Sequence, residues 1–177
     1  VERFLRMAMR LGSTAIVTNA NLLWVRSTAE LFMPQVIPLL DQVLCIVSAR
    51  QSYGKKWPGD RAAWKRQAFC DIVSRVRAND GNKRVAAPVN LVVLGDSAAE
   101  IRAGPAALRV RRSADSIVKT VKFKELPTTS ELVGQLRAVT KSLEHVVAED
   151  RSASKQLVCG GLSGWMVRDV GCGMWGL

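Results

Sequence analysis

Short apolar runs alternate with longer segments of mixed polarity along most of the chain. Four runs stand out, at residues 14–20, 43–48, 90–95 and 117–123. Apolar runs of this length, bounded by turn residues, are typical of strands that are buried on both faces of a parallel sheet. The segments between them carry apolar residues at helical spacing. The alternation predicts an α/β fold, a Rossmann-like parallel sheet with helices on both faces.

Five segments are expected to be helical. They are residues 1–11, 22–33, 60–78, a short stretch from 97 to about 104, and 128–147. The last has the clearest start, because Thr128 and Glu131 have the spacing of a capping box. The fourth is expected to stop at Gly104 and Pro105, since proline interrupts a helix.

Three expectations about packing follow from the same pattern. Residues 49–59 should form a loop. Lysines interrupt the apolar run at 117–123, and because lysines are a usual means of blunting a sheet edge, this strand is expected at the edge. The helix at 22–33 should turn its apolar side toward the core. That side carries Leu23, Trp24, Leu31 and Phe32.

The organisation of the chain changes near residue 149. Residues 1–149 carry the alternating pattern and are expected to form one core. Residues 150–177 show no clear period and contain several glycines, which predicts an irregular C-terminal extension. The extension either docks on a partner or has no defined fold.

The chain has 177 residues and a formal net charge of +11. This charge is compatible with an anionic partner, whether nucleic acid, an acidic protein or an acidic membrane surface. The basic residues are spread along the chain without the interleaved aromatic residues of an RNA-binding motif, so a solvated basic surface is the simpler explanation. No apolar run approaches the roughly 20 residues that span a bilayer.

The four cysteines are scattered and form no Cys-x-x-Cys pair, and His145 is the single histidine. A zinc site is therefore not expected. Cys45 and Cys70 are interpreted as buried reduced thiols. The sequence leaves the compartment open within an intracellular setting, cytoplasmic or organellar.

The stretch at 90–100 carries the strongest candidate chemistry. An apolar run ends in Gly95, Asp96 and Ser97, and Glu100 follows four positions after the aspartate. Gly95 lets the chain turn sharply, and Ser97 can cap a following helix. Asp96 and Glu100 would then face one opening at the carboxyl end of a strand, where two carboxylates suit Mg²⁺. The alternative is that Asp96 only caps the helix and that Glu100 is a solvated helix residue.

Three motifs, in this order, resemble those of the haloacid-dehalogenase-like (HAD-like) hydrolases. Ile-Val-Thr-Asn at 16–19 resembles the second motif, an apolar strand that ends in Ser or Thr. Lys65, off the apolar face of the helix before the strand at 90–95, resembles the lysine of the third motif. Leu-Gly-Asp-Ser-Ala-Ala-Glu at 94–100 resembles the fourth motif. The resemblance covers roughly residues 1–147.

Two segments, 49–69 and 119–127, are similar to a poorly characterised HAD-like group in protists and algae. In the family, a strand-end aspartate attacks phosphorus and a second aspartate serves as acid and base. The resemblance also implies binding residues for phosphate and for Mg²⁺. They are Thr18, Asn19 and Lys65 for phosphate, and Asp96 and Glu100 for the metal.

The motif that carries catalysis in this family is missing. No apolar strand ending in Asp-x-Asp occurs in the chain, so the nucleophile and the acid/base are absent. The resemblance therefore implies a pseudoenzyme that acts as a binding or structural component of a larger protein or assembly. Two alternatives remain open. One is a Mg²⁺-dependent phosphoric monoester hydrolase whose catalytic aspartates lie upstream, and the other is a basic subunit of an organellar assembly that contains nucleic acid.

The missing motif also leaves a structural gap. In the family its strand lies centrally, between the strands of the second and fourth motifs, and each unpaired backbone group buried there costs about 1–3 kcal/mol. The strand could come from upstream, from another chain or from the tail after Glu149. The interpretation we favour is an N-terminally incomplete chain.

Overall fold

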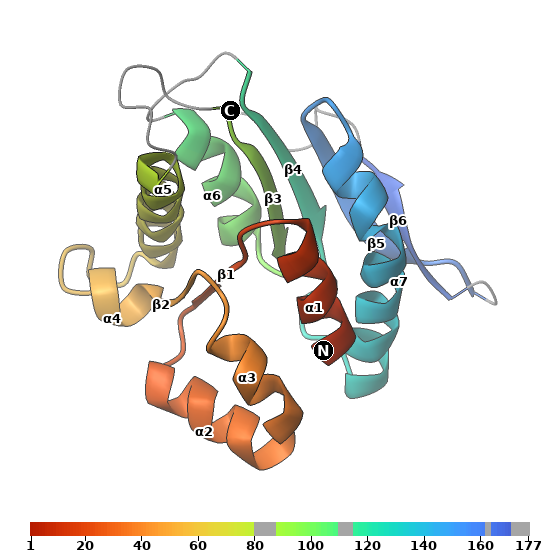
Figure 1. Cartoon of the computed structure of the whole chain (residues 1–177), viewed down its shortest axis with the longest axis horizontal. Helices are drawn as coiled ribbons and strands as arrows, with labels where there is room; N and C mark the ends of the chain where they lie inside the picture. Colours follow the sequence, from red (N-terminus) through yellow and green to blue (C-terminus); the bar gives the residue numbers. More distant parts are fainter. Residues whose placement is uncertain (80–87, 110–114, 162–163, 171–177) are drawn as a thin grey trace.

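The computed structural model describes residues 1–79, 88–109, 115–161 and 164–170 (Figure 1). Its helices are α1 (Glu2–Leu11), α2 (Leu22–Phe32), the 3-10 turn η1 (Pro34–Val36), α3 (Ile37–Leu40), α4 (Ala49–Tyr53), α5 (Arg61–Asn79), α6 (Ala98–Arg109) and α7 (Thr129–Ala148). Its strands are β1 (Ala15–Thr18), β2 (Cys45–Ser48), β3 (Asn90–Gly95), β4 (Ile117–Lys122), β5 (Ala153–Cys159) and β6 (Trp165–Asp169). None of the helices in the described part is both long and apolar enough to cross a membrane.

The strands form two separate hydrogen-bonded sheets. β1 and β2 pair in parallel, with Thr18 opposite Ser48 at their carboxyl ends. The second sheet has the order β3-β4-β5-β6, in which β3, β4 and β5 are parallel and β6 is antiparallel to β5. The predicted α/β class is confirmed. The single parallel sheet is corrected to a two-stranded parallel sheet and a four-stranded mixed sheet.

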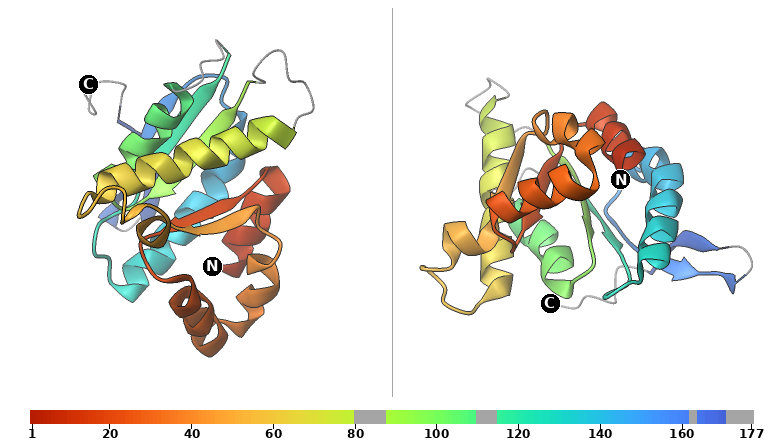
Figure 2. Two further views of the ribbon diagram at one scale, coloured as in Figure 1. Left: turned by 90° about the vertical axis from the view of Figure 1, so that its left-hand side faces the viewer. Right: turned by 90° about the horizontal axis from the view of Figure 1, so that it is seen from below.

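Helices cover both faces of the larger sheet (Figures 1 and 2). On one face, Ala107 and Leu108 of α6 are buried together with Val73 of α5. On the other face, Val139 of α7 is buried with Val121 of β4, and the partly buried Phe4 of α1 packs against the same cluster. The sheet therefore has helical layers on its two faces, as the alternating pattern predicts.

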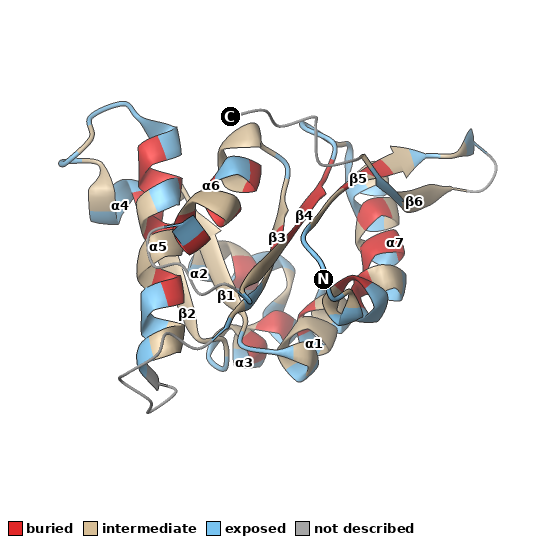
Figure 3. Ribbon diagram, turned by 90° about the horizontal axis from the view of Figure 1, so that it is seen from above, coloured by how far each residue is buried: buried red, intermediate tan, exposed pale blue. Residues whose placement is uncertain are grey.

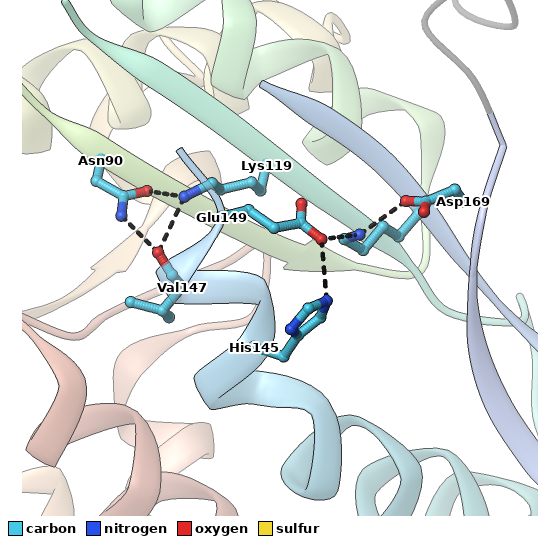
Figure 4. A network of polar contacts seen from close by, with 7 residues as sticks. Asn90, Lys119, His145, Val147, Glu149 and Asp169 are labelled. Atoms are coloured by element: carbon cyan, nitrogen blue, oxygen red, sulfur yellow. Dashed lines mark hydrogen bonds and ion pairs between the residues drawn. The ribbon is translucent and has the colours of Figure 1, made fainter. Parts of the chain in front are cut away.

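The capping box predicted for the last helix is confirmed in α7. The Thr128 hydroxyl accepts from Glu131 N, and Thr128 N donates to the Glu131 carboxylate at 2.8 Å. The other end of α7 is also held, because Lys119 Nζ and Asn90 Nδ2 both donate to Val147 O (Figure 4). Helix α7 is thus anchored to β3 and β4 at its carboxyl end.

The lysine-bearing strand β4 lies inside the sheet, between β3 and β5, so the expected edge position is wrong. Lys119 is fully buried, and its ammonium group reaches Asn90 Oδ1 at 2.8 Å. Burial lowers the pKa of Lys119, although the charge of Glu149 opposes this effect. An interior strand can hold a lysine here because the long aliphatic stem carries the charge to polar partners at the sheet margin.

The segment after residue 149, expected to be irregular, forms β5 and β6 in its described part. Buried Lys155 of β5 lies 2.7 Å from Asp169 of β6 and also pairs with Glu149 at the end of α7 (Figure 4). Because β5 pairs with the far side of β4, its two neighbours are β4 and β6. The described part of this segment therefore does not lie between β1 and β3.

Helix α2 leaves most of its apolar side in solvent, contrary to expectation. Buried residues, drawn red in Figure 3, are plain instead on α5, α7 and β4. Ala29 is the buried residue of α2. Helical periodicity identifies an apolar face but not what the face meets, and α2 lies at the margin of the molecule. The side chains expected in the core are 63–77% exposed, namely Leu23, Trp24, Leu31 and Phe32.

Two local boundaries also differ from expectation. Residues 49–53 form the short helix α4 instead of a loop, and the Ser48 hydroxyl caps it by accepting from a backbone amide at 3.3 Å. Helix α6 continues through Pro105. Ile101 before the proline and Leu108 after it are both buried. Their packing supports the helix across the lost hydrogen bond.

Candidate functional site

An apolar cleft of about 630 Å³ lies between β1 and β3. Ile16 and Val17 of β1 line one wall, and Val92 and Leu94 of β3 line the other. Helix α5 closes one face of the cleft, and α1 and α7 close the other. The apolar helical residues that line it are Phe4, Leu5, Ala8 and Leu11 of α1, Phe69, Ile72, Val73 and Val76 of α5, and Leu143 and Val147 of α7, and the charged ones are Arg77 of α5 and Glu100 of α6. The cleft is therefore a slot in the strand layer, covered by helices.

Lys65 of α5 joins the two walls of the cleft at their carboxyl ends. Its Nζ donates to Val17 O at 2.8 Å and lies 2.9 Å from Glu100 Oε1. Lys65 is only 3% exposed, so its expected place off the buried face of the helix is wrong. The partner that allows a charge to be buried there, Glu100, is 35 positions away and cannot be found from helical spacing.

Glu100 uses both carboxylate oxygens within the chain. Oε1 pairs with Lys65, and Oε2 accepts from Ser97 N at 3.2 Å. Burial alone would raise the pKa of Glu100, but the hydrogen bond and charge of Lys65, helped by Ser97, leave that pKa below its ordinary value. Glu100 is therefore held as a carboxylate, and it ties the start of α6 to the end of β1.

Asp96 lines the same cleft but is exposed. Its own backbone carbonyl accepts from Lys122 Nζ at 2.6 Å. In the described ranges of the chain, no three His, Cys, Asp or Glu side chains gather closely enough to hold a metal ion. Since Glu100 is already occupied, Asp96 is the one free carboxylate of the predicted pair, and it would offer Mg²⁺ a single carboxylate ligand.

Thr18 and Asn19 follow each other at the end of β1. The Thr18 hydroxyl accepts from Ala20 N at 3.0 Å and keeps its own proton for donation. Asn19 Oδ1 is buried and has no hydrogen-bond partner among the described residues. The structure thus brings Lys65 and Glu100 into contact, with Asp96 on the same cleft. Thr18 and Asn19 lie at the end of β1, outside the described lining of the cleft.

Lys122 belongs to this end of the sheet, although the sequence did not single it out. It lies opposite Gly95 in the β3–β4 register. Besides the carbonyl of Asp96, its Nζ binds Phe123 O at 2.9 Å and lies 3.1 Å from Glu125. The available signal was a lysine near the end of the apolar run at 117–123, and the lysines of that run were interpreted as edge protection instead.

Comparison of the chain with protein-family models, with curated proteins and with solved structures finds no match in any of the three. These comparisons neither support nor contradict a HAD-like relationship. The geometry at the cleft is therefore the basis on which a function can be proposed.

Proposed function

We propose that this chain is a HAD-like domain without a nucleophile, acting in this form as a binding or structural component of a larger protein or assembly. One observation carries the proposal. The cleft between β1 and β3 has a lysine and two acidic residues at its carboxyl end, but its described lining contains no carboxylate other than Asp96 and Glu100.

The arrangement of charges supports a non-catalytic role. Transfer of a phosphoryl group through an aspartyl-phosphate needs a carboxylate free to attack and cations free to neutralise the phosphoryl oxygens. Lys65 is taken by Glu100 and by Val17 O, so its charge is already balanced. Glu100 is likewise taken, which leaves Asp96 without a second acidic group.

Hydrolysis of p-nitrophenyl phosphate in the presence of Mg²⁺ tests the proposal, with Asp96→Asn as the control variant. We expect the chain and the variant to release p-nitrophenol at the same background rate. Since Asp96 is exposed, the substitution should leave folding intact, which circular dichroism can check. Mg²⁺-dependent turnover by the chain that Asp96→Asn abolishes would contradict the non-catalytic role.

The second candidate is a Mg²⁺-dependent phosphatase whose catalytic aspartates are supplied by another segment. The free carboxylate of Asp96 on the cleft favours it, because Mg²⁺ is commonly held by one or two carboxylates together with substrate phosphate. This candidate predicts activity only when that segment is present. The same assay on the chain together with such a segment, with Asp96→Asn as the control, separates the two candidates.

A further inference from the structure

We propose that the exposed side of α2 is a self-association surface, on which a second copy of this chain docks its own α2 in the antiparallel direction. This surface lies outside the described lining of the cleft, and its use does not depend on the proposed function. We call it the α2 face, and it consists of Leu23, Trp24, Ser27, Thr28, Leu31 and Phe32.

The α2 face points away from the rest of the described chain. At about 3.6 residues per turn, its members share one half of the helix, whereas the buried Ala29 lies on the other half. Helix α2 also lies at the margin of the molecule in two perpendicular views (Figures 1 and 2). A contiguous apolar patch of this kind is typical of a surface that meets another protein.

The α2 face carries no charge, although the chain has a formal net charge of +11. The two charged residues of the helix lie outside the face, where Arg26 contacts Glu30 at 3.2 Å and Asp41 at 2.9 Å. Nucleic acid or an anionic membrane would be met by cations at the contact. An uncharged apolar face instead favours a partner with a face of the same kind, which a second copy supplies.

The residues of the α2 face are arranged symmetrically about its middle. Large apolar residues occupy positions 23–24, small polar residues 27–28 and large apolar residues again 31–32. A two-fold axis at the small residues therefore brings the turn at 23–24 of each copy against the turn at 31–32 of the other. The small side chains at the crossing let the two helices approach closely. The antiparallel direction also aligns the helix dipoles favourably.

The area of the α2 face is sufficient for a weak dimer. A phenylalanine or tryptophan side chain offers about 150–250 Å². With leucine somewhat smaller, the four large side chains at 63–77% exposure offer roughly 500 Å² per copy and about 1,000 Å² for the pair. This total is at the lower limit for specific interfaces. We therefore expect a reversible dimer with a dissociation constant of about 10–100 µM.

Sedimentation velocity of the chain at concentrations from about 1 to 500 µM tests the proposal. We expect a shift from monomer to dimer, and we expect Trp24→Glu to weaken dimerisation at least about tenfold, because the contact would bury an unpaired charge. The matched control is Leu126→Glu, since Leu126 is 94% exposed and lies outside α2. It should leave dimerisation unchanged. A chain that stays monomeric, or a dimer that survives Trp24→Glu, would overturn the proposal.

Cysteine cross-linking tests the direction of the two helices. In the antiparallel dimer the two copies of residue 27 lie side by side near the axis, whereas the two copies of residue 23 lie roughly 14 Å apart along the helices. We expect oxidation to link Ser27→Cys into a dimer, but not Leu23→Cys, above the level of the parent chain with its four cysteines. Equal or stronger linking through Leu23→Cys would overturn the antiparallel arrangement.

Salt and vesicles separate self-association from binding to an anionic surface. Because both copies are strongly basic, we expect the dimer to strengthen as NaCl rises from about 50 to 500 mM and screens their repulsion. Co-sedimentation with vesicles of phosphatidylcholine and phosphatidylserine that Trp24→Glu abolishes, and Leu126→Glu does not, would assign the α2 face to a membrane and overturn the proposal. None of these measurements uses phosphatase activity, so failure here and failure of the non-catalytic role are separate results.

Discussion

At the scale of single residues, the pair formed by Lys65 and Glu100 decides how the candidate site behaves. Both side chains are largely buried, and their charges satisfy each other at the carboxyl end of the cleft. Removing one member would leave the other charge with a weaker partner, which is costly in a buried site. The pair therefore stabilises the fold, and neither side chain can bind a ligand unless the contact between Lys65 Nζ and Glu100 Oε1 breaks.

Replacing Glu100 with Gln should lower the free energy of unfolding by about 2 kcal/mol at neutral pH, because a hydrogen bond between charged groups becomes one to a neutral amide. Since folding lowers the pKa of Glu100 below its ordinary value of 4.5, the stabilisation is present above pH 4.5 and is lost as pH falls through the folded pKa. Urea unfolding from pH 7 to pH 3 should show the two proteins converging in acid.

The matched control for this substitution is Glu30→Gln. Glu30 pairs with Arg26 in the same kind of ion pair, but both side chains are more than half exposed. Exposed pairs contribute little to stability. We expect no measurable loss from Glu30→Gln at any pH in the series. A difference between chain and Glu100→Gln that stays constant down to pH 3 would contradict the charge-based explanation.

At the scale of elements, the sequence patterns predicted local structure well, but they predicted poorly how the elements pack against one another. The capping box of α7 and the turn at Gly95 are local features, and the structure contains both of them. The lysines of β4 led to the wrong prediction of an edge strand because their partners, such as Asn90 and Asp96, come from outside the strand. Lys65 was likewise misplaced because its partners, Val17 O and Glu100, come from other elements.

The exposed side of α2 and the strands after residue 149 could not be predicted for a related reason. Trp24 and Leu23 have helical spacing, but only the tertiary arrangement shows that no described element covers them. β5 and β6 have weak periodicity of their own, and they form because β4 offers an edge and Lys155 finds Glu149 and Asp169. Contacts between segments that are far apart in the sequence determine both the exposure of α2 and the formation of β5 and β6.

The capping box gives a prediction at this scale. Thr128→Ala removes the hydroxyl that accepts from Glu131 N and should lower the free energy of unfolding by about 1 kcal/mol. Thermal or urea unfolding measures the change. Thr129→Ala, one position inside the helix, is the control and should cause no loss, since alanine favours a helix. Equal losses of unfolding free energy from the two substitutions would show that the Thr128 cap does not contribute to stability.

At the scale of the whole molecule, the two sheets and the cleft between them form a single layer that is interrupted at one position. Helices cover the cleft on both faces, since α5 and α1 both line it. The net charge of +11 permits an anionic partner, yet the cleft itself is mostly apolar. The cleft therefore suits an apolar occupant better than a nucleic acid.

Residue-resolved hydrogen exchange tests most directly whether β3 is open on the side of the cleft, as the arrangement in two sheets requires. Leu91 and Val93 turn their peptide groups toward β4, whereas Val92 and Leu94 turn theirs toward the cleft. We predict slow exchange at Leu91 and Val93 and clearly faster exchange at Val92 and Leu94, an alternation along one buried strand. Equally slow exchange at all four amides would mean that β3 is paired on both sides, and it would contradict the arrangement in two sheets with a cleft between them.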